Sequence, residues 1–139
     1  MDKRISSRGV IIQDNQIITL FRRKKRENKI VEYYSIPGGG LEENETIEEC
    51  VVRELKEELS VDVEVKGYIG KRETDTGIQY YFGCKLINGT PILGGEEKER
   101  NNPENYYEIR YLPVKDLYQA DIEAKDLIQK AINKEYSEY

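Results

Sequence analysis

The sequence predicts an α+β fold, a single domain built on a mixed β-sheet, and three observations carry this prediction. The chain has 139 residues, the length of one domain, and contains no internal repeat and no Pro/Gly/Ser-rich linker. Segments with strand character come first, followed by an amphipathic helix, more strands and a closing amphipathic helix. Because strands and helices do not alternate, we expect residues 1–139 to form one layered α+β domain rather than a doubly wound parallel sheet.

Three strands are predicted ahead of the first helix, at residues 5–14, 16–21 and 29–36. The first two are joined by Asp14 and Asn15, which favour tight turns. The third is rich in β-branched and aromatic residues, whereas the charged run at residues 22–29 is expected to be a loop. The Pro-Gly-Gly-Gly run at residues 37–40 then ends the third strand.

The second half begins with a helix at residues 46–59 and continues with strands at residues 61–71, 78–87 and 106–112. Glycine, asparagine and proline make the connection at residues 88–95 irregular. Near the C-terminus the apolar residues fall on one face of a helical wheel, at Ala124, Leu127, Ile128, Ala131 and Ile132. This spacing predicts a C-terminal amphipathic helix over residues 121–135.

The composition restricts the chemistry that the chain can perform. It contains no histidine, which excludes Ser-His-Asp and Cys-His catalysis and almost every zinc or copper site. The net charge of -5 makes a nucleic-acid partner held by a broad basic face unexpected. We expect no membrane span and no signal peptide, because no apolar stretch is long enough. The two cysteines, Cys50 and Cys84, cannot build a disulfide framework, so the expected location is cytoplasmic.

The helix predicted at residues 46–59 carries acids on its apolar side. Its apolar stripe consists of Ile47, Cys50, Val51, Leu55 and Leu59. At about 100° per residue, Glu54 and Glu58 fall inside this stripe and Glu57 lies on its edge, so the three side chains should converge. Carboxylates this close repel one another, and burying an unpaired one is costly. A bound divalent cation such as Mg²⁺ or Mn²⁺ would offset this repulsion. The alternative is an acid-rich helix whose carboxylates are solvated.

The glycine run in front of this helix, Gly38 to Gly40, adds to the case for a phosphate ligand. Glycines let the backbone approach a ligand closely, and the N-terminus of a helix favours phosphate. An ordinary turn has the same composition, and no Gly-Lys-Ser/Thr follows as a Walker motif requires.

Residues 39–61 read GGLEENETIEECVVRELKEELSV and resemble the Nudix box of the MutT-like Nudix hydrolases. The matching positions are Gly39, Glu45, Arg53, Glu54, Leu55, Glu57, Glu58 and Val61. One position departs, because Ser60 stands where the box has its last glycine. That residue follows the helix, where glycine eases a left-handed cap, so we expect a conformational cost and no change in the chemistry.

The resemblance implies an α/β/α sandwich with the box helix on one face of a mixed sheet and a C-terminal helix. It implies a pyrophosphohydrolase that acts on a nucleoside diphosphate linked to another group, with Mg²⁺ or Mn²⁺ activating the water that attacks phosphorus. By position, Glu54, Glu57 and Glu58 would be both metal ligands and catalytic residues, with the Gly38 carbonyl as a further ligand.

The resemblance also implies structural roles for Glu45 and Arg53, with Arg53 orienting a glutamate through charge-assisted hydrogen bonds. The general base stays open between two box residues, Glu57 and Glu58, and the loop acids. These loop acids, which a solvated loop would explain equally well, are Glu96, Glu97 and Glu99.

Substrate contacts are expected from Gly38, Gly39 and Gly40 and from Arg22, which starts a basic run at residues 22–26. This run would steer phosphates, unless it is only a solvated hairpin loop. Adjacent tyrosines offer one member each to stack on a nucleobase or to pack in the core, at residues 33–34, 80–81 and 106–107.

The substrate stays undetermined. The ADP-ribose hydrolases of the family carry a proline after the box, and residues 61–90 contain none. Two alternatives remain: an inactive nucleotide-binding or regulatory module, and an RNA 5′-pyrophosphohydrolase that uses the basic run. A small-molecule nucleotide is the expected partner, and a homodimer is conceivable.

Overall fold

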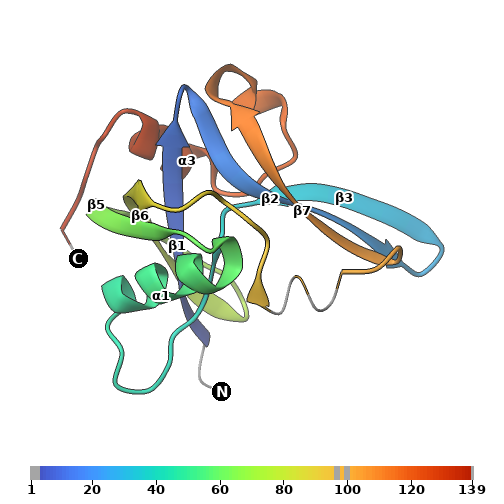
Figure 1. The fold of residues 1–139 in the computed structure, drawn as a ribbon, viewed down its shortest axis with the longest axis horizontal. Helices are drawn as coiled ribbons and strands as arrows, with labels where there is room; N and C mark the ends of the chain where they lie inside the picture. The colour runs from blue at the N-terminus through green and yellow to red at the C-terminus, as the bar shows by residue number, and fades with distance from the viewer. Residues whose placement is uncertain (1–3, 96–97, 99–100, 139) are drawn as a thin grey trace.

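The computed structural model describes residues 4–95, 98 and 101–138, and Figure 1 shows the ribbon. The strands are β1 (Arg4–Gln13), β2 (Gln16–Arg26), β3 (Lys29–Ser35), β4 (Gly38–Gly40), β5 (Asp62–Glu73), β6 (Gly77–Asn88) and β7 (Asn105–Pro113). Helices form at α1 (Ile47–Leu59), at the 3₁₀ helix η1 (Val114–Gln119) and at α3 (Lys125–Ile132).

The strands form a mixed sheet in the order β3-β2-β1-β6-β5, with β4 paired to β1 and β7 paired to β2. Strands β1 and β6 run parallel from Arg4↔Gly77 to Ile11↔Cys84, and the other strand pairs are antiparallel. Together with the helices this sheet confirms the predicted α+β class.

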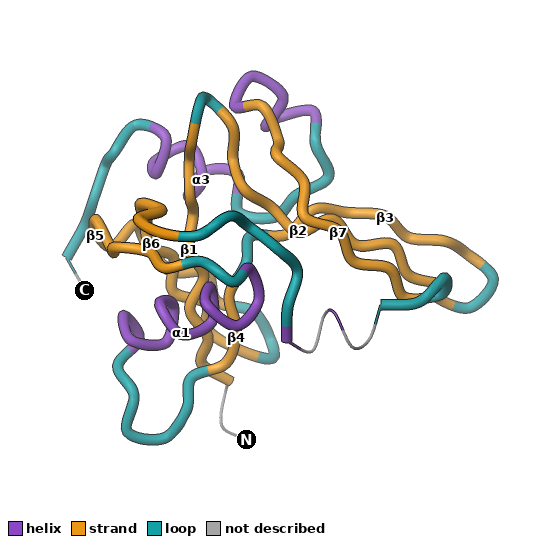
Figure 2. The backbone as a smooth tube through the Cα atoms, in the orientation of Figure 1, coloured by secondary structure: helices purple, strands orange, loops and turns teal. Residues whose placement is uncertain are grey.

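Helices α1 and α3 cover opposite faces of the sheet, as the tube in Figure 2 also shows. Successive side chains of a strand point to opposite faces, so Val10 of β1 packs in the core beneath α3 and Ile11 in the core beneath α1. Leu55 of α1 and Ile128 of α3 are fully buried in these two cores. The arrangement is the α/β/α sandwich that the resemblance to the Nudix hydrolases implies. No helix in the described part of the chain combines the length and the apolar character needed to span a membrane.

The charged run at residues 22–29 differs from the prediction. Strand β2 continues to Arg26 and pairs with β3 as far as Arg26↔Lys29, so the loop predicted at residues 22–29 is wrong. The cross-strand partners of Arg22 are Tyr33 on β3 and Tyr107 on β7. Aromatic cross-strand neighbours stabilise long cationic side chains in a strand, which overrides the low strand propensity of the run.

The C-terminal helix is shorter than the predicted residues 121–135. Helix α3 begins only after Ala124, which adopts a left-handed conformation with φ of 62°. The preceding segment pairs with β3 instead, where the Tyr34 N–H donates to the Asp121 carbonyl at 2.8 Å. The 3₁₀ helix η1 was not predicted, because six residues are too few for a periodic signal.

Helix α1 lies where the sequence predicts it, and its two ends explain why. Thr46 is the N-cap of a capping box: its hydroxyl accepts from the Glu49 N–H at 3.0 Å, and the Glu49 carboxylate accepts from the Thr46 N–H at 2.9 Å. At the other end Ser60 adopts the left-handed conformation expected there, with φ of 60°. These caps fix where the acids of the helix meet the rest of the fold.

Candidate active site

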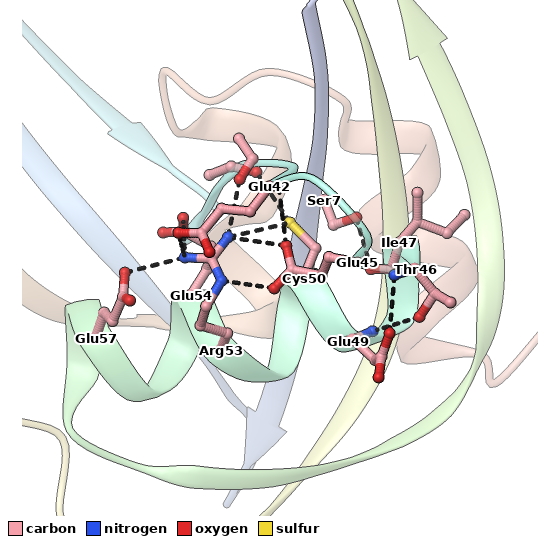
Figure 3. A network of polar contacts seen from close by, with 12 residues as sticks. Ser7, Glu42, Glu45, Thr46, Ile47, Glu49, Cys50, Arg53, Glu54 and Glu57 are labelled. Atoms are coloured by element: carbon pink, nitrogen blue, oxygen red, sulfur yellow. Dashed lines mark hydrogen bonds and ion pairs between the residues drawn. The ribbon is translucent and has the colours of Figure 1, made fainter.

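Arg53 of α1 ties the helix to the segment that precedes it (Figure 3). Its guanidinium binds Glu45 in a bidentate way, with Nε donating to Oε2 at 2.6 Å and Nη2 donating to Oε1 at 3.0 Å. Nη2 also donates to the Gly40 carbonyl at 2.9 Å. The hydrogen bonds from Arg53 hold the pKa of Glu45 below its ordinary value, and Glu45 in turn raises the pKa of Arg53.

Nη1 of the same guanidinium faces further carboxylates. It donates to Glu54 at 2.9 Å and to Glu57 at 3.1 Å, and it lies 3.4 Å from Glu42. Four carboxylates, with that of Glu45, therefore share one guanidinium, and negative charge remains in excess around Arg53. A site of this kind attracts a cation with oxygen ligands.

Glu58 lies one turn further along α1 and is buried, with 6% of its surface exposed. Its Oε2 accepts a hydrogen bond from the backbone N–H of Gly38 at 2.9 Å. Gly38 belongs to β4, which lies so close to β1 that a Cβ at this position would overlap the Ser7 carbonyl oxygen. Only glycine lets the backbone come this near, which brings β4 within reach of the helix acid.

Glu54 meets the same short strand at the next residue. A Cβ on Gly39 would overlap the Glu54 carboxylate, so this carboxylate lies directly against the β4 backbone. The Glu54 side chain is 14% exposed. The low exposure of Glu54 and Glu58 confirms the prediction that both lie within the apolar stripe of the helix.

Glu57 differs from the other two acids. Its side chain is 53% exposed and is directed toward Arg53, its i−4 neighbour on the helix. Among the described residues, no three acidic, cysteine or histidine side chains are arranged to hold a metal ion, so the expected convergence of all three glutamates is not seen. The donor set still fits Mg²⁺ or Mn²⁺, because it consists of oxygens with negative charge in excess of the single guanidinium.

A pocket of about 610 Å³ opens beside these acids, and Glu58, Gly38 and Gly39 lie in its lining. Gly40 is not among the lining residues, and its carbonyl is occupied by Arg53. The size suits a small-molecule ligand. Four cationic side chains also line the pocket, at Arg4, Arg8, Arg22 and Arg26. The acids Asp121 and Glu123 lie in the lining as well, so the four arginines outnumber the three acids and favour an anionic ligand.

The predicted substrate residue Arg22 is thus in the pocket wall, but Arg4 carried no sequence signal. Arg4 is recruited because β1 pairs with β4 and brings its guanidinium beside Gly40. Of the tyrosine pairs, Tyr81 and Tyr107 line the pocket without their neighbours. Both Tyr33 and Tyr34 line it, although neighbours on a strand point to opposite faces, so the expectation of one member from each pair is wrong here. The candidate bases of the loop, Glu96, Glu97 and Glu99, lie outside the described residues.

Comparison with known proteins defines the class of this fold and site. The model of the NUDIX domain family matches residues 3–131, so the chain belongs to that family. The resemblance of residues 39–61 to the Nudix box is thereby confirmed as a family relationship.

The relatives that match this chain are named as three different enzymes. The chain is 29% identical over 107 residues to an ADP-ribose pyrophosphatase of Methanocaldococcus jannaschii, covering 76% of this chain and 62% of the relative. It is 29% identical over 93 residues to an RNA pyrophosphohydrolase of a Marinomonas species, covering 66% and 54%. The chain therefore spans less than two thirds of the length of either relative. A shorter match of 55 residues, at 36% identity, is to an 8-oxo-dGTP diphosphatase of Proteus vulgaris, covering 40% and 48%.

Solved structures share the fold. A MutT NUDIX hydrolase from Burkholderia pseudomallei superposes with a TM-score of 0.68 at 20% identity, covering 95% of this chain and 99% of that one. An ADP-ribose pyrophosphatase from Streptococcus suis gives 0.66 at 18% identity, covering 99% and 96%. At these identities the likeness establishes the fold alone.

Proposed function

We propose that the chain is a Mg²⁺- or Mn²⁺-dependent pyrophosphohydrolase of a nucleoside diphosphate linked to another group. One observation carries this proposal: the carboxylates of Glu54 and Glu58 meet the backbone of Gly38 and Gly39 beside an arginine-lined pocket. Acids that would hold a divalent ion and cations that would hold phosphates thus belong to one site. A phosphoric anhydride is the bond that such a site suits.

Three carboxylates, those of Glu54, Glu57 and Glu58, would hold the ion, with the Gly38 carbonyl as a further ligand. The bound ion would neutralise charge on the pyrophosphate and lower the pKa of the attacking water. Arg53 positions Glu54 and Glu57 through its hydrogen bonds, and the Gly38 N–H orients Glu58. Glu57 or Glu58 would accept the proton of the water.

Arginines of the pocket would bind the substrate phosphates, and the position of Arg22 in the pocket wall supports this role for it. The three relatives named above are a pyrophosphatase, a pyrophosphohydrolase and a diphosphatase, each of a different substrate. Their names support the class of reaction and leave the nucleotide derivative to be found by assay.

The test is a turnover screen with Mg²⁺ or Mn²⁺ over nucleoside triphosphates, oxidised nucleotides, nucleotide sugars, ADP-ribose, dinucleotides and triphosphorylated RNA. On the best substrate, Glu58→Gln should lower kcat at least about 100-fold, because it removes charge from an ion ligand while keeping its shape. The matched control is Glu43→Gln, which changes an exposed acid outside the site and should leave turnover unchanged. Wild-type turnover by Glu58→Gln contradicts the proposal, and binding without any product indicates an inactive module instead.

We also propose that the chain works in the cytoplasm. Cys50 and Cys84 are both buried and form no disulfide, which is typical of proteins from a reducing compartment. A homodimer stays a prediction that sedimentation equilibrium would test.

A further inference from the structure

Strands β2, β3 and β7 continue beyond the helix-covered part of the sheet as a three-stranded arm, which projects to the right in Figure 1. Pairing is unbroken to the end of the hairpin, at Arg26↔Lys29. On the other side β2 pairs with β7 as far as Lys24↔Asn105. The arm therefore presents two flat faces whose side chains alternate along each strand.

Among the strand residues that the structure describes, one of these faces carries cations and no acid. The register places Arg22, Lys24 and Arg26 of β2 on the same face as Lys29 of β3. Their cross-strand neighbours on that face are uncharged, at Val31, Tyr33, Asn105 and Tyr107. We call this surface the arm face and define it by Arg22, Lys24, Arg26, Lys29 and Tyr33. Tyr107 is buried and lies under the Arg22 guanidinium.

On the opposite face of the arm, acidic side chains pair with arginines. There Arg23 pairs with Glu32 at 3.1 Å, and Arg110 pairs with Glu108 at 2.9 Å. The two faces share the same strands but differ in charge, so the cationic character is a property of the arm face and not of the arm as a whole. The net charge of -5 describes the whole chain and hides this local field.

On the arm face, tyrosine rings hold the cations without neutralising them. The Arg22 guanidinium lies 4.5 Å from the Tyr107 ring centroid and 5.8 Å from that of Tyr33, and Nη2 donates to the Tyr107 hydroxyl at 2.6 Å. Lys24 Nζ lies 5.8 Å from the same Tyr33 ring. Arg22 Nε is buried and has no hydrogen-bond partner among the described residues, so its donor capacity is unused.

The arm face is continuous with the proposed active site. Arg22, Arg26 and Tyr33 line the same pocket as Gly38 and Glu58. From Arg22 to Arg26 the strand spans about 13 Å, at about 3.3 Å per residue. At about 3.4 Å per phosphate along a stacked strand, the row matches roughly four nucleotides. A mononucleotide, whose phosphates are joined directly to one another, is too short to reach along the whole row.

We propose that the arm face binds single-stranded nucleic acid, so that the substrate of this site is a strand whose 5′ end carries the phosphoric anhydride. The backbone phosphates would lie along the cations, and bases would stack on the half-buried ring of Tyr33 and the half-buried guanidinium of Arg22. This inference rests on the proposed function for the chemistry at the 5′ end. The binding surface itself is independent of it.

Two adjacent lysines provide the test, since Lys24 lies on the arm face and Lys25 on the opposite face. Lys24→Glu and Lys25→Glu change the net charge equally. The binding of a short, 3′-labelled, 5′-triphosphorylated RNA is followed by fluorescence anisotropy in EDTA, where no turnover is needed. Lys24→Glu should weaken binding at least about fourfold at about 0.15 M salt and lower the log–log salt slope by about 0.7, the effect of one lost phosphate contact. Lys25→Glu should change neither.

If the two variants weaken RNA binding equally, the proposal that the arm face binds the strand is wrong. Equally effective competition by inorganic polyphosphate, which lacks bases, also contradicts the proposal. Thermal melts of both variants exclude unfolding as the cause. If the turnover screen yields no product but the two lysines differ in RNA binding, the arm face stands and the proposed function fails. If nucleotides are hydrolysed and the two lysine variants bind RNA equally well, the proposed function stands and the arm face fails as a binding surface.

Discussion

Arg53→Ala removes the one guanidinium that several carboxylates share, and its effect on stability can be worked out from the contacts. Arg53 donates five hydrogen bonds to oxygen atoms, two to Glu45 and one each to Glu54, Glu57 and the Gly40 carbonyl, and a sixth to the Cys50 sulfur. Without it, Glu45 and Glu54 stay behind with only 12% and 14% of their side chains exposed. Breaking a buried ion pair by removing one partner costs about 3–5 kcal/mol, and partial access of water favours the lower end, about 3 kcal/mol.

Urea unfolding at pH 7 measures this loss. With an m-value of about 2 kcal/mol per M, the midpoint should fall by about 1.5 M. The control is Arg72→Ala, which breaks a surface pair with the largely exposed Glu123 and should cost less than about 1 kcal/mol. Arg53→Lys keeps the charge but cannot make the bidentate contact, so we expect an intermediate loss.

The loss should also depend on pH, with a sign set by Glu45. Its pKa is lowered in the folded protein, chiefly by the hydrogen bonds from Arg53. The stabilisation is therefore fully present above the usual glutamate pKa of about 4.3 and disappears as the pH falls through the lower folded value. The difference between wild type and Arg53→Ala should shrink in this acid range. Equal midpoints at pH 7, or a difference that does not change with pH, would refute this reasoning.

Two further substitutions test the C-terminal cap of α1 and the contact between α1 and β4. Ser60→Gly should raise the free energy of unfolding by about 1 kcal/mol, because glycine adopts the left-handed cap conformation without strain; an unchanged or lower urea midpoint would contradict this. Gly39→Ala should leave the far-ultraviolet circular dichroism and the melting temperature nearly unchanged, since only the end of the Glu54 side chain must move. Its kcat on the best substrate should nevertheless fall at least about tenfold, and wild-type kcat would show that the contact between Gly39 and Glu54 is irrelevant to turnover.

Helix α1 could be predicted almost to the residue because its signals are local. Thr46 and Glu49 form a capping box three residues apart, and the apolar period places Glu54 and Glu58 on the buried side. The strands of the two cores followed in the same way from their apolar and aromatic residues.

The parts that the sequence did not reveal depend on contacts between distant segments. The run from Arg22 to Arg26 has the composition of a loop, and only its pairing with Tyr33 and Tyr107 makes it a strand. The presence of Arg4 beside Gly40 also depends on distant segments, because it follows from the pairing of β1 with β4. The orientation of Glu57 toward Arg53 is different, since the i, i+4 spacing on the helix already brings these two side chains together.

We propose above that Glu54, Glu57 and Glu58 hold a divalent ion next to the backbone of Gly38. Calorimetric titration of Mn²⁺ into the wild type and into Glu58→Gln tests it most directly, with Glu43→Gln as the matched control. The account predicts that Glu58→Gln weakens Mn²⁺ binding at least about tenfold while the control keeps the wild-type affinity. Equal Mn²⁺ affinities for the wild type and Glu58→Gln would contradict it.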